Sequence, residues 1–334
     1  MLRKSRTTVK RKNGKKKHDK CQIRAGEGIR EAGFMLYWTG NDGKGERGMR
    51  ISELLKRDGV TFSLEVFPPK TSAKYSETAE TAREIARLKP DFMSVTYGAG
   101  GGTSEFTTGI AADIQRTLGV PTLAHLTCVS SSRAHVLKML EMYRENGIEN
   151  ILALRGDVPK DGPVSEDYRY AVELIRDIRE HGDFCIGGAC YPEGHVESPH
   201  KADDLKHLKE KTDAGLDFLT TQMFFNNDVF YNFLYRAREA GITVPVIAGI
   251  MPITNPRMLQ RSVAMSGTDV PQRFRAIVDC FGEDPEAMRQ AGVVYATEQI
   301  IDLIANGIRH IHVYTMNKPE VAAGIMKNLS AILK

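Results

Sequence analysis

An acidic residue lies within an apolar strand pattern at residues 61–69, TFSLEVFPP. Side chains alternate between the two faces of a strand, so Ser63, Glu65 and Phe67 share one face. The two prolines that follow cannot continue a central strand, which places Glu65 near a carboxyl end. A carboxyl group at such a position is either a functional group or a structural acid paired with an Arg or a Lys.

Polar or Gly-rich residues end the other apolar runs of the sequence as well. Arg155-Gly156-Asp157 ends the fourth run, where the Arg suits an anion contact and the Asp a buried charge with a function. His125 ends the third run, and the alternative for it is a core histidine with satisfied hydrogen bonds. The other runs end at Thr96-Tyr97-Gly98, at 191–195, at Gln222, at 249–252 and at 314–317.

Three further motifs have a chemical and a purely structural interpretation. The segment 98–103, GAGGGT, resembles a dinucleotide fingerprint but has Thr103 where the third Gly is required, so a Rossmann site is rejected. Phe224 and Phe225 are adjacent, so one can pack in the core while the other faces a ligand. The third motif is a row of polar side chains on one face of the predicted helix 201–214, which is typical of a solvated surface. The row consists of Asp204, His207, Glu210 and Lys211.

These residues need a scaffold that brings the carboxyl ends of several strands together. Apolar runs suited to buried parallel strands occur at 61–67, 92–96, 122–127, 151–155, 185–190, 217–222, 244–249 and 309–314. Representative helical patterns between them cover 76–88, 107–118, 133–146, 168–180, 201–214 and 229–240. Eight βα units in about 286 residues predict an α/β protein with the (β/α)8 TIM barrel fold. The pattern is weakest at 255–295, where Pro256, Pro271 and Pro285 interrupt the helical periodicity.

Composition excludes several classes of protein. The chain has 334 residues, of which 41% are hydrophobic and 26% charged, as in an ordinary globular protein. There is no apolar run of membrane-spanning length, and the first twenty residues are too basic for a signal-peptide core. The five cysteines, an odd number without a repeated short spacing, favour free thiols over disulfides or a zinc site. We therefore expect a cytoplasmic protein without a metal site.

Charge is distributed unevenly along the chain. Residues 1–48 contain fourteen Lys or Arg and five Asp or Glu, a net charge of +9, whereas the remaining 286 residues carry 32 and 37, a net charge of −5. This composition predicts a basic, disordered N-terminal extension at 1–48 and a barrel domain at 49–334. For the extension, a nucleic-acid-binding arm and a transit peptide are the alternatives to a segment without a function.

Nine short motifs occur in an order and spacing that resemble the methylenetetrahydrofolate reductase family in its single-domain bacterial form. They are SLEVFPPK, SVTYGAGGGT, AHLTC, ALRGD, YPEGH, DLKHLKEKTDAG, TQMFF, GIMP and YTMNK, and the resemblance covers residues 49–334. It implies a flavoprotein barrel in which FAD passes a hydride from NADH or NADPH to 5,10-methylenetetrahydrofolate, giving 5-methyltetrahydrofolate. The absence of a Rossmann motif agrees with this, because nicotinamide and folate take turns on one flavin face in the family.

The resemblance also implies roles for individual residues. Glu65 would be the general acid that assists opening of the folate imidazolidine ring, Asp157 the carboxylate beside flavin and pterin, and Gln222 a hydrogen-bonding group for both substrates. Burial is expected to raise the pKa of Glu65, which suits a proton donor at neutral pH. Phe224 and Lys318 would contact the substrate, Lys318 through the glutamate tail. The positions that match the flavin site are Thr96, Tyr97, Ala99, His125, Arg155, Gly156, Asp157, Ala171, Tyr191, His195, Asp204, His207 and Lys211.

The sequence departs from the family at three of these places. His207 and Glu210 stand where some members have Asn and Arg, Pro256 stands where some place a Phe that stacks on folate, and Lys318 stands where some have an Arg. The chain ends after the helix expected to follow the eighth strand, so neither the regulatory domain of the eukaryotic enzymes nor inhibition by S-adenosylmethionine is expected.

Partners and alternative functions remain open at this point. The expected partner is the folate substrate, without membrane or nucleic acid, and either a homo-oligomer or an additional electron-transfer subunit is compatible with the sequence. The alternative functions are a barrel lyase or isomerase without flavin, and a nucleic-acid-binding protein that acts through the basic tail.

Overall fold

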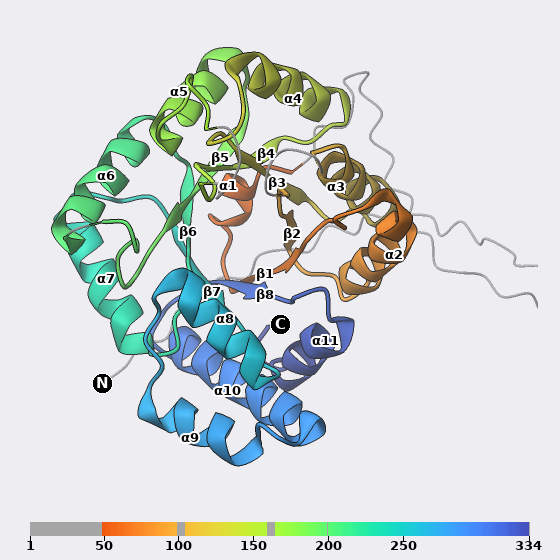
Figure 1. Ribbon diagram of the computed structural model, residues 1–334, viewed down its shortest axis with the longest axis vertical. Coiled ribbons are helices and arrows are strands. Elements are labelled where there is room, and N and C mark those ends of the chain that lie inside the picture. The colour runs from red at the N-terminus through yellow and green to blue at the C-terminus, as the bar shows by residue number, and fades with distance from the viewer. Residues whose placement is uncertain (1–48, 99–103, 159–163, 199, 334) are drawn as a thin grey trace, which may run out of the picture. The chain divides into compact units, whose positions relative to one another are not determined.

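The eight strand patterns form a closed barrel of parallel strands, paired in the order β1 to β8, in a computed structural model of the chain (Figure 1). The structure describes residues 49–98, 104–158, 164–198 and 200–333. The predicted extension at 1–48 and the candidate residue Ala99 lie outside the described residues. The strands are β1 (Thr61–Val66), β2 (Phe92–Val95), β3 (Thr122–Thr127), β4 (Asn150–Leu154), β5 (Cys185–Cys190), β6 (Phe218–Thr221), β7 (Val246–Ile250) and β8 (His310–Tyr314).

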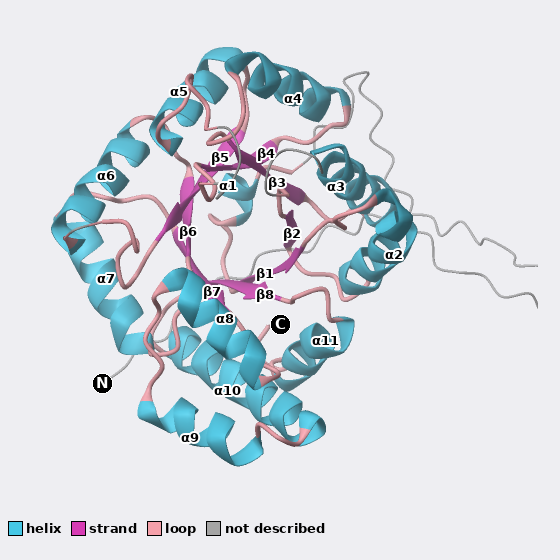
Figure 2. Cartoon of the chain, in the orientation of Figure 1, coloured by secondary structure: helices cyan, strands magenta, loops and turns pink. Residues whose placement is uncertain are grey.

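Helices alternate with the strands and surround the barrel, which confirms the predicted (β/α)8 fold (Figure 2). The predicted strand boundaries agree with the structure to within two residues, and the predicted helix boundaries to within three. The first helices are α1 (Ile51–Leu54), α2 (Tyr75–Ala86), α3 (Ser104–Leu118), α4 (Arg133–Glu145), α5 (Ala171–His181), α6 (Lys201–Asp213) and α7 (Asn227–Glu239), with a short 3-10 helix at Ser72–Lys74. The remaining helices are α8 (Pro256–Ser266), α9 (Gln272–Phe281), α10 (Pro285–Ala305) and α11 (Pro319–Asn328).

The prolines of the segment 255–295 begin helices, which explains why they divide the periodic pattern. Pro256 and Pro285 are the first residues of α8 and α10, where a missing backbone N–H costs nothing because it would have no helical partner. Pro271 is the N-cap residue of α9. Two helices, α8 and α9, are therefore added between β7 and the barrel helix α10, and Figure 1 shows α9 on the side of α10 away from the strands.

Apolar side chains fill the space between the sheet and the helices and also close the amino-terminal end of the barrel. Ile51, Leu54 and Leu55, from α1 and its C-cap, pack against a layer of residues from the barrel interior. That layer consists of Phe92, Leu123, Leu152, Cys185, Phe218 and Ile247. Because this end is packed, the polar interior groups lie toward the carboxyl ends of the strands. None of the described helices is both long enough and apolar enough to cross a membrane.

Candidate active site

The carboxyl group of Glu65 lies on the inner face of the barrel near the carboxyl end of β1, as the alternation of side chains predicts. It comes within 3.5 Å of His125 on β3, a strand that does not pair with β1, so it must project into the interior. The Glu65 side chain is 17% exposed, and Ser63 below it is completely buried. Leu64 and Val66, on the other face of the strand, belong to the core beneath the helices.

A network of hydrogen bonds surrounds this carboxyl group. Ser94 Oγ donates to Glu65 Oε2 at 3.0 Å and lies 3.3 Å from His312 Nε2, which is itself 3.5 Å from Glu65 Oε2. On the other side of the imidazole, His312 Nδ1 lies 2.8 Å from Ser63 Oγ. Ser63 Oγ donates its proton to the carbonyl oxygen of Ile311 at 3.1 Å, so its oxygen accepts from Nδ1–H. The neutral imidazole therefore has Nε2 as its acceptor.

Glu65, Ser94 and His312, which we call the acid–imidazole cluster, can hold one proton in two ways. In the first, Nε2–H of a charged His312 donates to Ser94 Oγ, and Ser94 donates to an ionised Glu65. In the second, a protonated Glu65 donates to Ser94 Oγ, and Ser94 donates to the neutral imidazole. The net charge is the same in both, so a proton can reach Glu65 without entering from the solvent.

The expectation that Glu65 has a raised pKa is wrong, because the sum of all interactions lowers it. Burial does raise the pKa of this carboxyl group, but other interactions lower the pKa below its ordinary value. These are the hydrogen bond with His312, the charges of His125 and His312, and the hydrogen bond from Ser94. The pattern of residues 61–69 predicts the apolar strand but contains no sign of imidazoles from β3 and β8. A proton-donor role for Glu65 therefore works against the net direction of this pKa shift.

His125 is a buried histidine on β3. Its Nε2 atom lies 3.5 Å from Glu65 Oε2, near enough for an ion pair, but it forms no hydrogen bond with any of the described residues. Burial lowers the pKa of His125 to about 4, against the opposing effect of the Glu65 charge. His125 is therefore neutral at neutral pH, with a buried polar atom that suits contact with a ligand.

This depressed pKa predicts that the protein loses stability in mild acid. Between pH 6.5 and about 4 the unfolded chain binds a proton at His125 and the folded chain does not, so the free energy of unfolding falls as the pH falls. The full loss from this group is roughly 3 kcal/mol. Urea unfolding measured across this range should show a flatter pH dependence in His125→Asn. The same replacement of the exposed His200 should keep the parent slope, and an equal slope in both variants would contradict the prediction.

The ends of β1 and β8 are joined above the cluster. Thr315 Oγ1 donates to the carbonyl oxygen of Glu65 at 2.6 Å, and the Asn317 side chain forms two 2.9 Å hydrogen bonds with the backbone N–H and C=O of Phe67. Met316 and Asn317 both adopt left-handed backbone conformations, with φ of 54° and 53°. Two consecutive non-Gly residues in this region are costly, so the turn is held by its surroundings.

The predicted residues after β4 lie at the rim of the barrel. Arg155 forms a two-point ion pair with Glu197, at 2.5 and 2.9 Å. Gly156 has φ of +85°, and a Cβ atom there would lie 3.0 Å from Thr127 Cβ, so Gly is required for two reasons. Asp157 is exposed. Its charge, after the larger effect of burial, contributes to raising the pKa of Tyr191 to about 12, which places Asp157 near that ring.

The structure separates the predicted row of polar residues on α6 into two groups. Lys211 turns toward the barrel, where its Nζ donates to the Ala189 carbonyl of β5 at 2.8 Å and burial lowers its pKa. Asp204 lies on the same side and opposes this shift, while Ser198 Oγ donates to its carboxylate at 3.4 Å. His207 is exposed and pairs with Glu210 at 3.3 Å, as expected for a solvated surface.

The other predicted cofactor residues take intermediate positions. The Tyr97 ring is buried after β2, and its hydroxyl lies 3.1 Å from His135 Nε2. Thr96 is half-buried next to it, and Ala171 is the half-buried first residue of α5. The His195 ring packs edge to face on Tyr191, with the ring centres 4.6 Å apart, and burial lowers the pKa of His195.

For one of the predicted substrate-binding residues, the prediction is wrong. Phe224 is completely buried and stacks on Phe230 of α7, with ring centres 5.2 Å apart, so it belongs to the core and no substrate can reach it. Its neighbour Phe225 is also buried. Gln222 is half-buried and accepts a hydrogen bond from the Met223 N–H at 2.9 Å. Lys318 is half-buried, and its Nζ donates to Thr254 Oγ1 at 2.6 Å.

The sequence analysis did not identify three residues that form or contact the acid–imidazole cluster. They are His312, Ser94 and Ser63. Each is a polar residue inside an apolar run that becomes a strand, and each faces the barrel interior. The signal that could have revealed them is the alternation within a strand, since His310 and His312 in HIHVY share a face just as Ser63 and Glu65 do.

The fold and this cluster define a class of protein. A closed (β/α)8 barrel whose ionisable interior groups gather at the carboxyl ends of the strands has the arrangement of the (β/α)8-barrel enzymes. Comparison with protein families identifies the particular family: the sequence profile described as methylenetetrahydrofolate reductase matches residues 50–330. The chain belongs to the methylenetetrahydrofolate reductase family, which confirms the resemblance.

Individual relatives and a solved structure agree with this family. The chain is 40% identical over 297 residues to methylenetetrahydrofolate reductase 1 of Schizosaccharomyces pombe, covering 85% of this chain but 49% of that protein. It is 36% identical over 279 residues to 5,10-methylenetetrahydrofolate reductase of Pectobacterium carotovorum, covering 84% of this chain and 92% of the bacterial protein. The chain thus spans about half the length of the yeast relative and nearly all of the bacterial one.

A protein from Clostridium thermocellum that binds two copies of 5-methyl-5,6,7,8-tetrahydrofolic acid has the same fold. Its structure matches with a TM-score of 0.60 and 14% identity, over 85% of this chain and 99% of that one.

Proposed function

We propose that this chain reduces 5,10-methylenetetrahydrofolate to 5-methyltetrahydrofolate, with a reduced nicotinamide as the electron donor and FAD as the resident cofactor. Membership of the family supports the reaction class. The structural observation that carries the proposal is the acid–imidazole cluster at the carboxyl end of the barrel, because this reaction needs a proton donor as well as a hydride source.

The cluster supplies the proton in this proposal. Opening of the five-membered ring of the substrate breaks a C–N bond, and Glu65 Oε2 donates a proton to the departing nitrogen. A substrate that covers the partly exposed carboxyl group removes water from it, which favours the neutral form of Glu65. The proton then moves from His312 to Glu65 through Ser94 Oγ. After the donation, an ionised Glu65 and a neutral His312 remain.

Asp157 and Gln222 have the accompanying roles. Ring opening leaves a cationic iminium group on the substrate, and the carboxylate of Asp157 stabilises this positive charge. The side-chain oxygen of Gln222 accepts the Met223 N–H, which holds the amide in place and leaves its NH2 group for the substrates. Lys318 is proposed to meet the negatively charged glutamate tail.

The residues around the cluster fit an FAD. His125 contributes a buried nitrogen that forms no hydrogen bond with the described residues. Lys211 contributes a half-buried ammonium group that donates one of its three protons to the Ala189 carbonyl. Arg155 supplies a positive charge for an anionic group. Gly156 has a left-handed backbone and no side chain, so the chain can approach that group closely. The remaining proposed contacts are Thr96, Tyr97, Ala99, Ala171, Tyr191, His195, Asp204 and His207. When bound, the flavin would supply the redox chemistry, accepting a hydride from the nicotinamide and delivering it to the folate.

The electron donor and the partners are further parts of the proposal. NADH is the proposed donor, with NADPH or an electron-transfer subunit as the alternatives that a titration can distinguish. We also propose a cytoplasmic protein that assembles as a homo-oligomer and whose function needs neither nucleic acid nor a membrane.

The visible spectrum of the purified protein tests the proposal directly. We expect flavin absorption bands, their loss on anaerobic addition of NADH, and their return on addition of methylenetetrahydrofolate. Protein that stays colourless after incubation with FAD would contradict the proposed function, and a flavin that neither nicotinamide reduces would contradict the proposed donor.

A matched pair of lysine variants on α6 tests the cofactor site. Lys211→Met should weaken FAD binding by roughly 10- to 100-fold, the usual value of a hydrogen bond to a charged group. Lys209→Met is the control, because Lys209 is paired with Asp213 on the same helix and is no part of the proposed site. Equal FAD dissociation constants for the two variants would remove Lys211 from the site.

A further inference from the structure

Tyr314, the last residue of β8, lies on the inner face of the barrel beside the acid–imidazole cluster. It is two residues beyond His312, so the two side chains share this face of the strand. In the pairing of β1 with β8, Tyr314 stands next to Glu65, just as His312 stands next to Ser63. Tyr314 is therefore the neighbour of the proposed acid on the adjacent strand, although it is not among the substrate and FAD contacts proposed above.

Two aromatic rings restrict the imidazole of His312. The Tyr314 ring is nearly perpendicular to it, at 87°, with the ring centres 5.1 Å apart. The Phe92 ring, from the layer that closes the amino-terminal end of the barrel, is nearly parallel to it at 6.3 Å. Such pairs prefer particular geometries, so the two rings limit how far the imidazole can tilt. Tyr314 limits it from the carboxyl end of the strands and Phe92 from the opposite end.

The hydroxyl of Tyr314 anchors its ring on the far side of a neighbouring strand. It donates to the carbonyl oxygen of Thr221, the last residue of β6, at 2.5 Å. β7 lies between β6 and β8, so the Tyr314 side chain crosses the inner face of β7. It crosses at Gly249, where a Cβ atom would lie 2.6 Å from the Tyr314 hydroxyl oxygen and 2.4 Å from the Thr221 carbonyl oxygen. The tyrosine thus occupies space that a side chain at position 249 would fill.

The same hydrogen bond excludes Tyr314 as a proton donor to the substrate. A phenol has a single proton, and the Thr221 carbonyl accepts it. Burial, and after it the charge of Glu65, raises the pKa of Tyr314 well above its ordinary value, so the hydroxyl stays protonated at neutral pH. Tyr314 is consequently a fixed support in the barrel interior and neither an acid nor a base.

We propose that Tyr314 is a positioning residue, which holds the imidazole of His312 in the orientation that directs Nε2 at Ser94 Oγ. The ring restricts the imidazole, and the hydrogen bond to Thr221 restricts the ring. The effect on the rate rests on the proposed function, because it requires the proton of the cluster to be used. The contact between the two rings does not depend on that function.

The distances in the cluster explain why a small tilt matters. Ser94 Oγ lies 3.3 Å from His312 Nε2 and 3.0 Å from Glu65 Oε2. The first of these distances is already at the upper end of the range for a hydrogen bond, so a slight rotation of the imidazole would break it. The proton could then no longer pass from His312 through Ser94 to Glu65.

Tyr314→Phe tests this inference because it removes the anchoring hydroxyl and keeps the ring. At saturating methylenetetrahydrofolate, reoxidation of the reduced flavin should slow by roughly two- to tenfold, the usual value of one neutral hydrogen bond. Reduction by NADH should keep the parent rate, because it needs no proton from the cluster. The folate concentration at half the limiting rate should also stay unchanged. A change confined to that concentration would show that Tyr314 acts through the adjacent Gln222, and would overturn the proposal.

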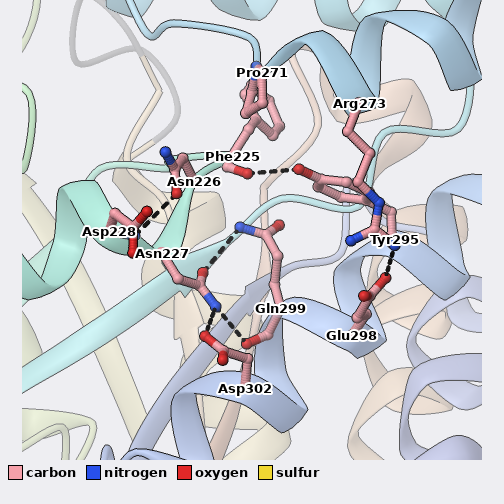
Figure 3. Close-up of a pocket in the computed structure, with 10 residues that line it drawn as sticks. All are labelled: Phe225, Asn226, Asn227, Asp228, Pro271, Arg273, Tyr295, Glu298, Gln299 and Asp302. Carbon is pink, nitrogen blue, oxygen red and sulfur yellow. Dashed lines mark hydrogen bonds and ion pairs between the residues drawn. The ribbon is translucent and has the colours of Figure 1, made fainter.

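Tyr295→Phe is the matched control. Tyr295 is also buried, and its hydroxyl donates to the backbone carbonyl of Phe225 at 2.7 Å, as Figure 3 shows. This control therefore also removes a tyrosine anchor from the segment around the end of β6. Tyr295 lines a pocket between α7, α9 and α10, and no residue of the acid–imidazole cluster lines that pocket. Both half-reactions should keep the parent rates in the control, and equal slowing in the two variants would overturn the proposal.

A double-mutant cycle tests whether Tyr314 acts through His312. In the background of His312→Gln, which has no imidazole to position, adding Tyr314→Phe should slow the folate half-reaction no further. Effects of the two replacements that multiply would overturn the proposal.

A second cycle, on urea unfolding, needs no activity. Here Tyr314→Leu removes the ring, and it should be coupled to His312→Gln by roughly two- to tenfold in the unfolding constant, the usual value of a contact between rings. Independent effects would overturn the proposed support of the imidazole, whether or not the protein is a reductase. Coupled unfolding in a parent protein that does not reduce methylenetetrahydrofolate would contradict the reductase proposal alone.

Discussion

Reoxidation of the reduced flavin by methylenetetrahydrofolate should slow by roughly 10²–10⁴-fold when Glu65 is replaced by Gln, the usual effect of losing a general acid. Reduction of the flavin by NADH should continue near the parent rate, because hydride transfer from the nicotinamide needs no proton from this residue. The amide keeps the shape of the side chain and an oxygen that can accept from Ser94, but it has no proton to transfer.

Stopped-flow absorbance of the flavin measures the two half-reactions separately. The fold should tolerate Glu65→Gln, since an amide is cheaper to bury than a carboxylate. Glu53→Gln, an exposed position at the opposite end of the barrel, is the control and should leave both rates unchanged. Comparable slowing of both half-reactions in Glu65→Gln, or an unaffected folate half-reaction, would show that Glu65 is a structural acid.

Replacing Gly292 by Ala should lower the free energy of unfolding by about 3 kcal/mol, the upper part of the range for an overpacked core. A Cβ atom at this position of α10 would lie 1.8 Å from the backbone oxygen of Ile253, in the loop after β7. A backbone atom cannot move aside as the end of a side chain can, so either α10 or the loop must shift. The gain in helix propensity from Gly to Ala, at most about 1 kcal/mol, is too small to offset this.

Urea unfolding of the flavin-free protein measures the effect. Gly324→Ala in α11 is the matched control, since its Cβ would meet a Val293 methyl at an ordinary 3.4 Å. We expect this control to be unchanged or slightly more stable. The displaced loop continues into Thr254, which accepts a hydrogen bond from Lys318. Gly292→Ala should therefore also weaken the proposed contact of Lys318 with the glutamate tail of the substrate. Equal stability of the two variants would contradict the close contact of α10 with the loop.

The fold was predictable because each element has a local signal. Eight apolar runs separated by helical patterns determine a (β/α)8 barrel without knowledge of any contact, and Glu65 is identified by two prolines and a strand alternation alone. The prolines of 255–295 also carry a local signal, since Pro at the first position of a helix marks its start. Read as helix starts, they predict the additional helices α8 and α9.

The parts that the sequence did not predict depend on contacts between distant segments. The pKa of Glu65 is set by His125 and His312, which are 60 and 247 positions away, so its direction cannot follow from the strand in which it lies. Phe224 follows Gln222 at a strand end, yet the turn into α7 directs its ring into the core.

The joining of the first and last strands has a consequence for synthesis on the ribosome. Ser63 and His312 are 249 positions apart, and the Asn317 side chain reaches Phe67 over a separation of 250. At a synthesis rate of about 5–20 residues per second, roughly 12 to 50 s pass between the synthesis of β1 and that of its partner strand β8. During this time the edge of β1 that β8 will cover has no partner strand, and Glu65 lacks the imidazole of His312. The acid–imidazole cluster is therefore assembled only when translation of the barrel is nearly finished, and a stalled ribosome would hold a chain with an open edge in need of a chaperone.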